Sequence, residues 1–230
     1  METRPGRFMV MTGGMGFLLV GVVLHFWAGS AEAAPQTCRK GFFPASGQTT
    51  CWDSLGHEIP CFGTDQDGDI QAGAPLRFQD NGDGTITDLN TGLVWEKHSD
   101  DGTVHDMNNT YTWENAFLLH IAELNATSFA GYQDWRLANV KELVSKIDFG
   151  QEGLSDPPVG VHSAFHNNCS PGCTVLTCSC TASSSFWSST SAPQQPTVAL
   201  IVGGVLVSAV LKSDTNQKWQ VRAVRGGCVE

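Results

Sequence analysis

The chain has 230 residues, with 23 acidic side chains against 13 lysines and arginines, and a formal net charge of −10. Nucleic acid, anionic lipid headgroups and sulfated polysaccharides are bound by clustered Lys and Arg, which this composition does not favour. We therefore expect no nucleic-acid partner, and a sulfated polyanion is an unfavourable ligand. Cations, in contrast, are attracted.

The N-terminus predicts export. Arg4 and Arg7 precede an apolar run from Phe8 to Trp27, and the tripeptide AEA at 31–33 fits a cleavage site. Because the run approaches the roughly 20 residues that span a bilayer, an uncleaved anchor is the alternative. We assign residues 1–33 to a signal peptide or N-terminal anchor, and expect the rest to be periplasmic, at the cell surface or secreted. Removal of residues 1–33 takes away two arginines and two glutamates, so the net charge of the remaining chain stays at −10.

All the cysteines follow this segment, so they reach an oxidising compartment and disulfides are expected. We expect Cys51 to pair with Cys61 around a small turn, and Cys38 to pair with Cys228 and tie the chain ends together. The full set is Cys38, Cys51, Cys61, Cys169, Cys173, Cys178, Cys180 and Cys228.

Four of these cysteines lie in the segment HSAFHNNCSPGCTVLTCSC, residues 162–180, together with two histidines. Zinc is one interpretation, since Cys and His are its usual ligands. The spacing is irregular and thiols oxidise after export, so two local disulfides are the favoured interpretation. The segment is expected to be a stapled loop, and His162, His166, Asn167 and Asn168 are its candidate ligand-binding residues.

The order of the expected elements indicates an α+β domain. Residues 34–75 are rich in Gly, Thr, Asp and Cys and are expected to form an N-terminal extension. A domain at 76–230 begins with three short strands separated by Asn-Gly and Asp-Gly turns, followed by an amphipathic helix and by a second helix that Asn139 and Glu142 cap. A long loop at 150–185 and further strands complete it. The expected strands are 76–79, 84–89, 92–97, 186–190, 197–204, 205–212 and 218–227, and the helices are 112–125 and 139–148.

Two acidic clusters are candidate calcium sites. Asp65, Asp67 and Asp69 alternate as in an EF-hand loop, but Ile70 stands where that loop needs Gly. Asn81 and Asp83 lie in DNGDGTITD, which lacks two anchor ligands of the motif. Turns with positive φ at glycines, in which Asp80 and Asp88 accept hydrogen bonds from turn amides, are the favoured interpretation of the second cluster. Calcium stays possible, and no other cofactor is indicated.

The remaining charged residues are interpreted as structural. Asp134 and Arg136 flank Trp135, which suits a buried corner of the fold. Arg222 and Arg225 are expected on one strand face with acidic partners. No nucleophile motif is present, because FWSST is not a Gly-x-Ser-x-Gly elbow and the cysteines are expected to be oxidised. We therefore do not expect an enzyme.

Five motifs carry a resemblance to a known family: RFQDNGDGTITDLNTGLVWEK, TWENA, GYQDWRLANVKEL, FWSST and VRAVRGG, over residues 76–227. They resemble the C-terminal domain family of the Legionella collagen-like protein, a bacterial domain listed as of unknown function. The resemblance implies a C-type lectin-like fold with two helices, antiparallel sheets and a long loop that carries recognition.

The chain departs from the family at three points. Ala138 replaces the proline of the WRLPN pattern, the strand at 197–204 lacks aromatic residues, and no Gly-X-Y repeat precedes the domain. The named member adheres to sulfated glycosaminoglycans through basic surface, which an acidic chain does not inherit.

The sequence therefore predicts an exported recognition or adhesion module that binds a carbohydrate or an envelope or surface protein through residues 150–185. Two alternatives stay open: a structural spacer, and an enzyme on a lectin-like scaffold.

Overall fold

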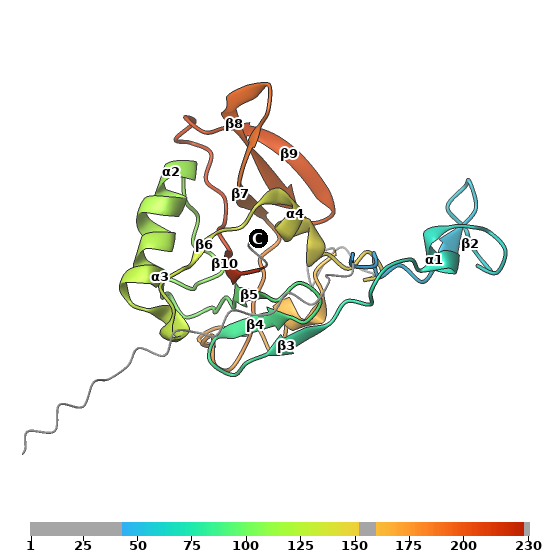
Figure 1. The fold of residues 1–230 in the computed structure, drawn as a ribbon, viewed down its shortest axis with the longest axis horizontal. Coiled ribbons are helices and arrows are strands. Elements are labelled where there is room, and N and C mark those ends of the chain that lie inside the picture. The colour runs from blue at the N-terminus through green and yellow to red at the C-terminus, as the bar shows by residue number, and fades with distance from the viewer. Residues whose placement is uncertain (1–42, 152–159, 228–230) are drawn as a thin grey trace, which may run out of the picture. The chain divides into compact units, whose positions relative to one another are not determined.

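The computed structural model describes residues 43–151 and 160–227, which lie within one compact unit, Gln36–Glu230 (Figure 1). The expected signal and the Cys38–Cys228 pairing fall outside the described residues. No helix within the described ranges is long and apolar enough to cross a membrane.

The larger sheet has five antiparallel strands in the order β3-β4-β5-β10-β6. Its first three strands, β3 (Phe78–Asp80), β4 (Thr85–Asp88) and β5 (Leu93–Glu96), form a meander, as the turn sequences predict. The late strand β10 (Ala223–Gly226) inserts between β5 and β6 (Arg136–Leu137). The sheet is therefore completed by a segment that is distant in sequence.

A second sheet is an antiparallel meander of β7 (Ser185–Ala192), β8 (Gln195–Gly203) and β9 (Leu206–Leu211). The sequence predicts these strands correctly, but it places residues 218–227 beside them. In the structure β10 belongs to the larger sheet instead. Among the described residues, one isolated bridge, between Phe186 and Gln220, joins this region to β7.

One long helix follows the first meander and runs as α2 (Trp113–Asn115), η1 (Ala116–Ile121) and α3 (Ala122–Ala126) (Figure 1). Thr112 accepts a hydrogen bond from Asn115 N and caps the start, as predicted. The central six residues form a π-helix, a rare form that often marks a special position. The sequence predicts the helix but not this segment.

A second helix, α4 (Val140–Ser145), begins at the predicted capping box and is shorter than expected. Asn139 Oδ1 accepts from Glu142 N at 2.9 Å, and Glu142 Oε2 accepts from Asn139 N at 2.8 Å. Arg136 donates two further bonds to the Glu142 carboxylate, at 2.8 and 2.6 Å. Two short 3-10 turns are also present, η2 (Phe129–Gly131) and η3 (Ser163–Phe165).

Two apolar cores form because successive strand residues point to opposite faces. In β5, Trp95 enters the first core while Val94 enters the second. In β7, Phe186 and Trp187 divide in the same way. The second core packs against the long helix through Ala116, Ile121 and Leu124, and the first contains residues of α4 and of the stapled loop. The domain is thus α+β with few helices, antiparallel sheets and disulfides, as predicted.

The N-terminal extension carries a small hairpin, β1 (Cys51–Trp52) and β2 (Glu58–Ile59), and the short helix α1 (Asp67–Ile70). The predicted Cys51–Cys61 disulfide is present. This disulfide closes a loop around residues 55–58, the turn that the sequence predicts.

Candidate recognition surface and its buried support

The stapled loop, defined here as residues 160–185, contains the two predicted local disulfides. Cys169 pairs with Cys180, and Cys173 pairs with Cys178 inside that ring. The sulfur atoms of Cys169, Cys173 and Cys180 all lie within 4.8 Å of one another, which is close enough for three ligands of one metal ion. Within the described ranges, this is the cluster of potential metal ligands that the structure contains. Because all three sulfur atoms are bonded in disulfides, they are not thiolate ligands in this structure.

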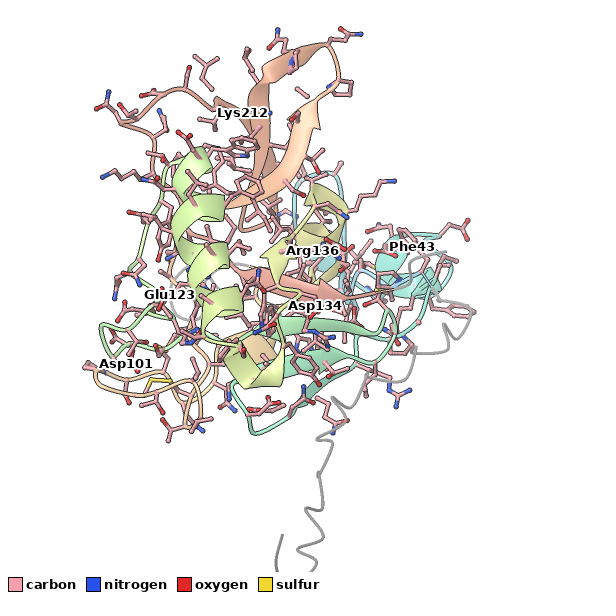
Figure 2. All side chains as sticks on the ribbon, turned by 60° about the vertical axis from the view of Figure 1, so that its left-hand side comes forward. Phe43, Asp101, Glu123, Asp134, Arg136 and Lys212 are labelled. Carbon is pink, nitrogen blue, oxygen red and sulfur yellow. A yellow bond between two sulfur atoms is a disulfide. The ribbon has the colours of Figure 1, made fainter. Side chains whose placement is uncertain are left out.

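Backbone hydrogen bonds join the loop to the segment that follows β5. Cys180 N donates to His98 O at 2.9 Å. Asp100 N donates to Cys173 O at 3.0 Å, and Gly172 N donates in return to Asp100 O at 2.6 Å. The outer disulfide ring is thereby docked on the segment that follows β5, the region near Asp101 in Figure 2.

The four predicted ligand residues of the loop divide into two kinds. His162 Nδ1 accepts from Ala164 N, its ring packs 4.7 Å from Phe78, and burial lowers its pKa. His166 Nδ1 accepts from Thr181 N at 3.2 Å. Asn167 and Asn168 are exposed, and Asn168 adopts a positive φ of 54°. The histidines therefore hold the base of the loop, whereas the asparagines face solvent.

Asn167 and Asn168 belong to an uncharged polar surface. The exposed residues of the loop beside them are small, hydroxyl-bearing or aliphatic: Ser170, Pro171, Thr174, Leu176 and Thr177. No Asp or Glu occurs anywhere between Asp156 and Asp214 in the sequence. The acidic charge of the chain is therefore carried by other segments.

The predicted calcium ligands of DNGDG are engaged in turn hydrogen bonds. Asn81 Nδ2 donates to Thr85 and Thr87, and Asp83 Oδ1 accepts from Thr85 N and Oγ1. Asp80 Oδ1 accepts from the amide of Gly82, whose φ is 75°, as predicted for a turn.

The other acidic cluster also makes local bonds. Asp69 Oδ2 accepts from Thr64 N at 3.0 Å and Asp65 N at 3.2 Å, and Asp67 accepts from Ser46 Oγ. Asp67 and Asp69 lie in the first turn of α1, where negative charge is favourable. This is a short helix rather than the expected irregular turn. A calcium role for either cluster stays a prediction.

Beneath the loop lies a buried polar centre that the sequence analysis missed. Glu96 is fully buried, and its carboxylate lies 2.7 Å from His105 Nδ1 and 2.8 Å from His120 Nε2, and accepts from Ala223 N at 3.0 Å. Burial by itself raises the pKa of Glu96. The charge of His120 and the hydrogen bonds from both histidines outweigh burial and hold this pKa well below its usual value. The π-helical segment contributes His120 to this centre.

Arg222 extends the support toward the loop. It is fully buried, and its Nη2 donates to Cys180 O at 2.7 Å and to Thr181 Oγ1 at 2.8 Å, while Nη1 donates to Glu96 O at 3.1 Å. Burial lowers its pKa to about 10, which still leaves it charged at neutral pH. The stapled loop is thus bonded directly to the interior.

The expectation that Arg222 and Arg225 share a strand face is wrong, because positions three apart point to opposite faces. Arg225 instead binds the Asp134 carboxylate at 2.6 and 3.1 Å and lies over the Tyr132 ring. Asp134 and Arg136 flank the buried Trp135, as Figure 2 lets the reader follow. The structural interpretation of that corner fits these contacts.

The missed residues had a faint sequence signal. The consecutive apolar residues Leu93, Val94 and Trp95 indicate a strand that is covered on both faces, and a glutamate that continues such a strand needs buried partners. Nothing in the sequence identified which histidines supply them.

A separate apolar groove of about 950 Å³ lies along α4. Its walls include Val140 and Val144 of α4, Leu200 of β8, Val207 of β9 and the exposed Phe43. Phe43 is labelled in Figure 2. The groove is a second candidate contact surface with a different chemistry from the loop.

Comparison with known proteins identifies the domain. The sequence model of the Lcl C-terminal domain family matches residues 84–225, which is more than half of the chain and includes β4 and all but the last residue of β10. No curated protein and no solved structure matches the chain, so the C-type lectin-like fold stays a prediction. The chain belongs to the Lcl C-terminal domain family.

Proposed function

We propose that this chain is an exported, non-enzymatic recognition or adhesion module that binds a carbohydrate, or a protein of the envelope or cell surface, through the stapled loop. The observation that carries the proposal is the construction of this loop. Two disulfides and the Arg222 hydrogen bonds fix the backbone that presents an exposed, uncharged polar surface.

Preorganisation of this kind supports binding because a fixed loop loses little conformational entropy when a ligand docks. Amide and hydroxyl groups suit the hydroxyls of a neutral sugar, which they can bind as donors and acceptors. Three disulfides among the described residues also support an oxidising compartment, and a long recognition loop is compatible with a C-type lectin-like scaffold.

The experiment is a glycan array and an envelope pull-down with the oxidised domain, compared across three variants. Asn167→Ala alters the loop surface, Val140→Asp alters the apolar groove, and Gln194→Ala is an exposed control at the β7–β8 turn. We expect loss of binding in Asn167→Ala alone.

Loss in Val140→Asp alone would move the site to the groove and contradict the loop proposal. Absence of any ligand for the folded, oxidised domain would favour the structural spacer. The enzyme alternative predicts a turnover that a His or Ser substitution abolishes without unfolding the chain.

A further inference from the structure

Two buried cations share one pair of aromatic rings under the stapled loop. Lys146 is 7% exposed and Arg222 is 0% exposed. Lys146 Nζ lies 4.7 Å from the ring centroid of Phe186 and 5.7 Å from that of Phe165. Arg222 Cζ lies 5.7 and 5.3 Å from the same two centroids. Both positive charges are therefore in one interior region.

The donors of these two side chains are not all satisfied. Arg222 Nε is buried and has no hydrogen-bond partner among the described residues. For Lys146 Nζ, too, the described ranges provide neither a hydrogen bond nor an ion pair, only the two rings. Trp95, whose ring packs edge-on against Phe165 at 6.1 Å, adds a third buried donor, Nε1, without an acceptor in the described chain.

The charges are not balanced either. All acceptors of Arg222 are uncharged: two carbonyls and the hydroxyl of Thr181. The charge of the Glu96 carboxylate raises the pKa of Arg222, but its hydrogen bonds are made with His105, His120 and Ala223 N. A cation over an aromatic ring gains about 2 kcal/mol when desolvated, whereas burial costs several kcal/mol per ion. The rings, together with one carboxylate that two histidines share, therefore do not offset the burial of two cations.

A ligand that completes this region must accept hydrogen bonds, carry negative charge and be small enough for a packed interior. A water molecule meets the first and third requirements but brings no charge. We propose that Lys146 and Arg222 form a binding site for a small monovalent anion of the halide class, held between Lys146 Nζ and Arg222 Nε beside Phe165 and Phe186.

The site would act on the stapled loop through Arg222, which also binds Cys180 O and Thr181 Oγ1. A bound anion lowers the cost of burying Arg222 and so stabilises the bonds that anchor the loop. This inference does not depend on what the loop recognises, because its readouts are stability and ion position.

The test is the melting temperature of the oxidised chain in sodium bromide and in sodium gluconate at equal ionic strength, so that general screening is matched. Bromide at about ten times its Kd should raise the melting temperature by about 3–6 °C. Lys146→Met should lose this rise, and Lys141→Met, which alters an exposed lysine of α4, should retain it.

Equal melting temperatures of the wild-type chain in the two salts would overturn the proposal, as would an unchanged bromide effect in Lys146→Met. If Lys146→Met does not fold, a wild-type crystal grown in bromide decides the question. Anomalous scattering between Lys146 Nζ and Arg222 Nε is expected. A water molecule at that position, without anomalous signal, would refute the site.

Discussion

Glu96 is the residue on which several elements converge, since it contacts the long helix, the segment after β5 and the backbone of β10. We expect Glu96→Gln to lower the free energy of unfolding by about 3–5 kcal/mol, because removing one partner of a buried charged cluster leaves the others uncompensated. Denaturant titration at pH 7 measures this, with the exposed Glu123→Gln as control. Equal losses in both variants would contradict the assigned role.

The same carboxylate predicts a pH dependence. Its folded pKa is depressed, so its contribution is complete above its ordinary pKa of 4.5 and is lost as the pH falls through the folded pKa. The difference in stability between wild type and Glu96→Gln should therefore shrink below about pH 4.5. If the difference in stability between the two proteins stayed constant down to the pH of acid unfolding, the charge of the Glu96 carboxylate would not be the source of the stabilisation.

Lys146 predicts a second rise of stability with pH, in a higher pH range than that of Glu96. Burial, and then the charge of Arg222, lower its pKa from 10.5 to about 7, so the folded chain binds fewer protons than the unfolded chain between these values. Stability should rise with pH from about 7 to 9, by up to about 1.4 kcal/mol per unit. In halide-free buffer Lys146→Met should lack this rise while Lys141→Met keeps it. A rise that persists in Lys146→Met would assign it to another group.

At the scale of elements, the two loop disulfides are expected to be unequal. Cys178 and Cys180 are both buried, but the carbonyl of Cys180 binds Arg222, and the Cys173–Cys178 bond closes a smaller ring, with a sequence separation of 5 against 11. Replacing both Cys169 and Cys180 by Ser should cost about 2–4 kcal/mol and expose the loop to proteolysis. Replacing Cys173 and Cys178 together should cost less and leave the protease pattern of the loop base unchanged.

These variants must be made in pairs. Cys180 Sγ lies 3.6 Å from Cys173 Sγ and 3.8 Å from Cys178 Sγ. A lone Cys180 thiol would therefore attack the neighbouring disulfide and form a new pairing. Peptide mapping of the single variant Cys169→Ser checks this directly, and an intact Cys173–Cys178 bond in it would contradict the expectation.

Local chemistry explains which elements the sequence could predict. The turns around Gly82, the box of Asn139 with Glu142, and the loop disulfides depend on residues close in sequence, and all three were predictable. The π-helical segment with His120 and the insertion of β10 beside β5 depend on contacts across more than 20 residues. A single sequence does not contain that pairing information, so the buried centre and the strand face of Arg222 were not predicted.

At the scale of the whole molecule, net charge determines which ligands the chain repels. With a net charge of −10, the domain should not be retained on heparin at physiological salt. Heparin chromatography at about 0.15 M salt checks this, with a basic protein as positive control. Retention that declines with added salt would show that basic side chains cluster on the surface, and sulfated polysaccharides would again be candidate ligands.

The position of β10 also determines when the domain can form. A chain that emerges N-terminus first releases β3, β4 and β5 well over a hundred residues before the strand that lies between β5 and β6. Until residue 226 is available, the inner edge of β5 is unpaired and Glu96 lacks the amide of Ala223. Folding is thus delayed until nearly the entire domain has been delivered. The larger sheet is thus among the last parts of the domain to close, however early its first three strands appear.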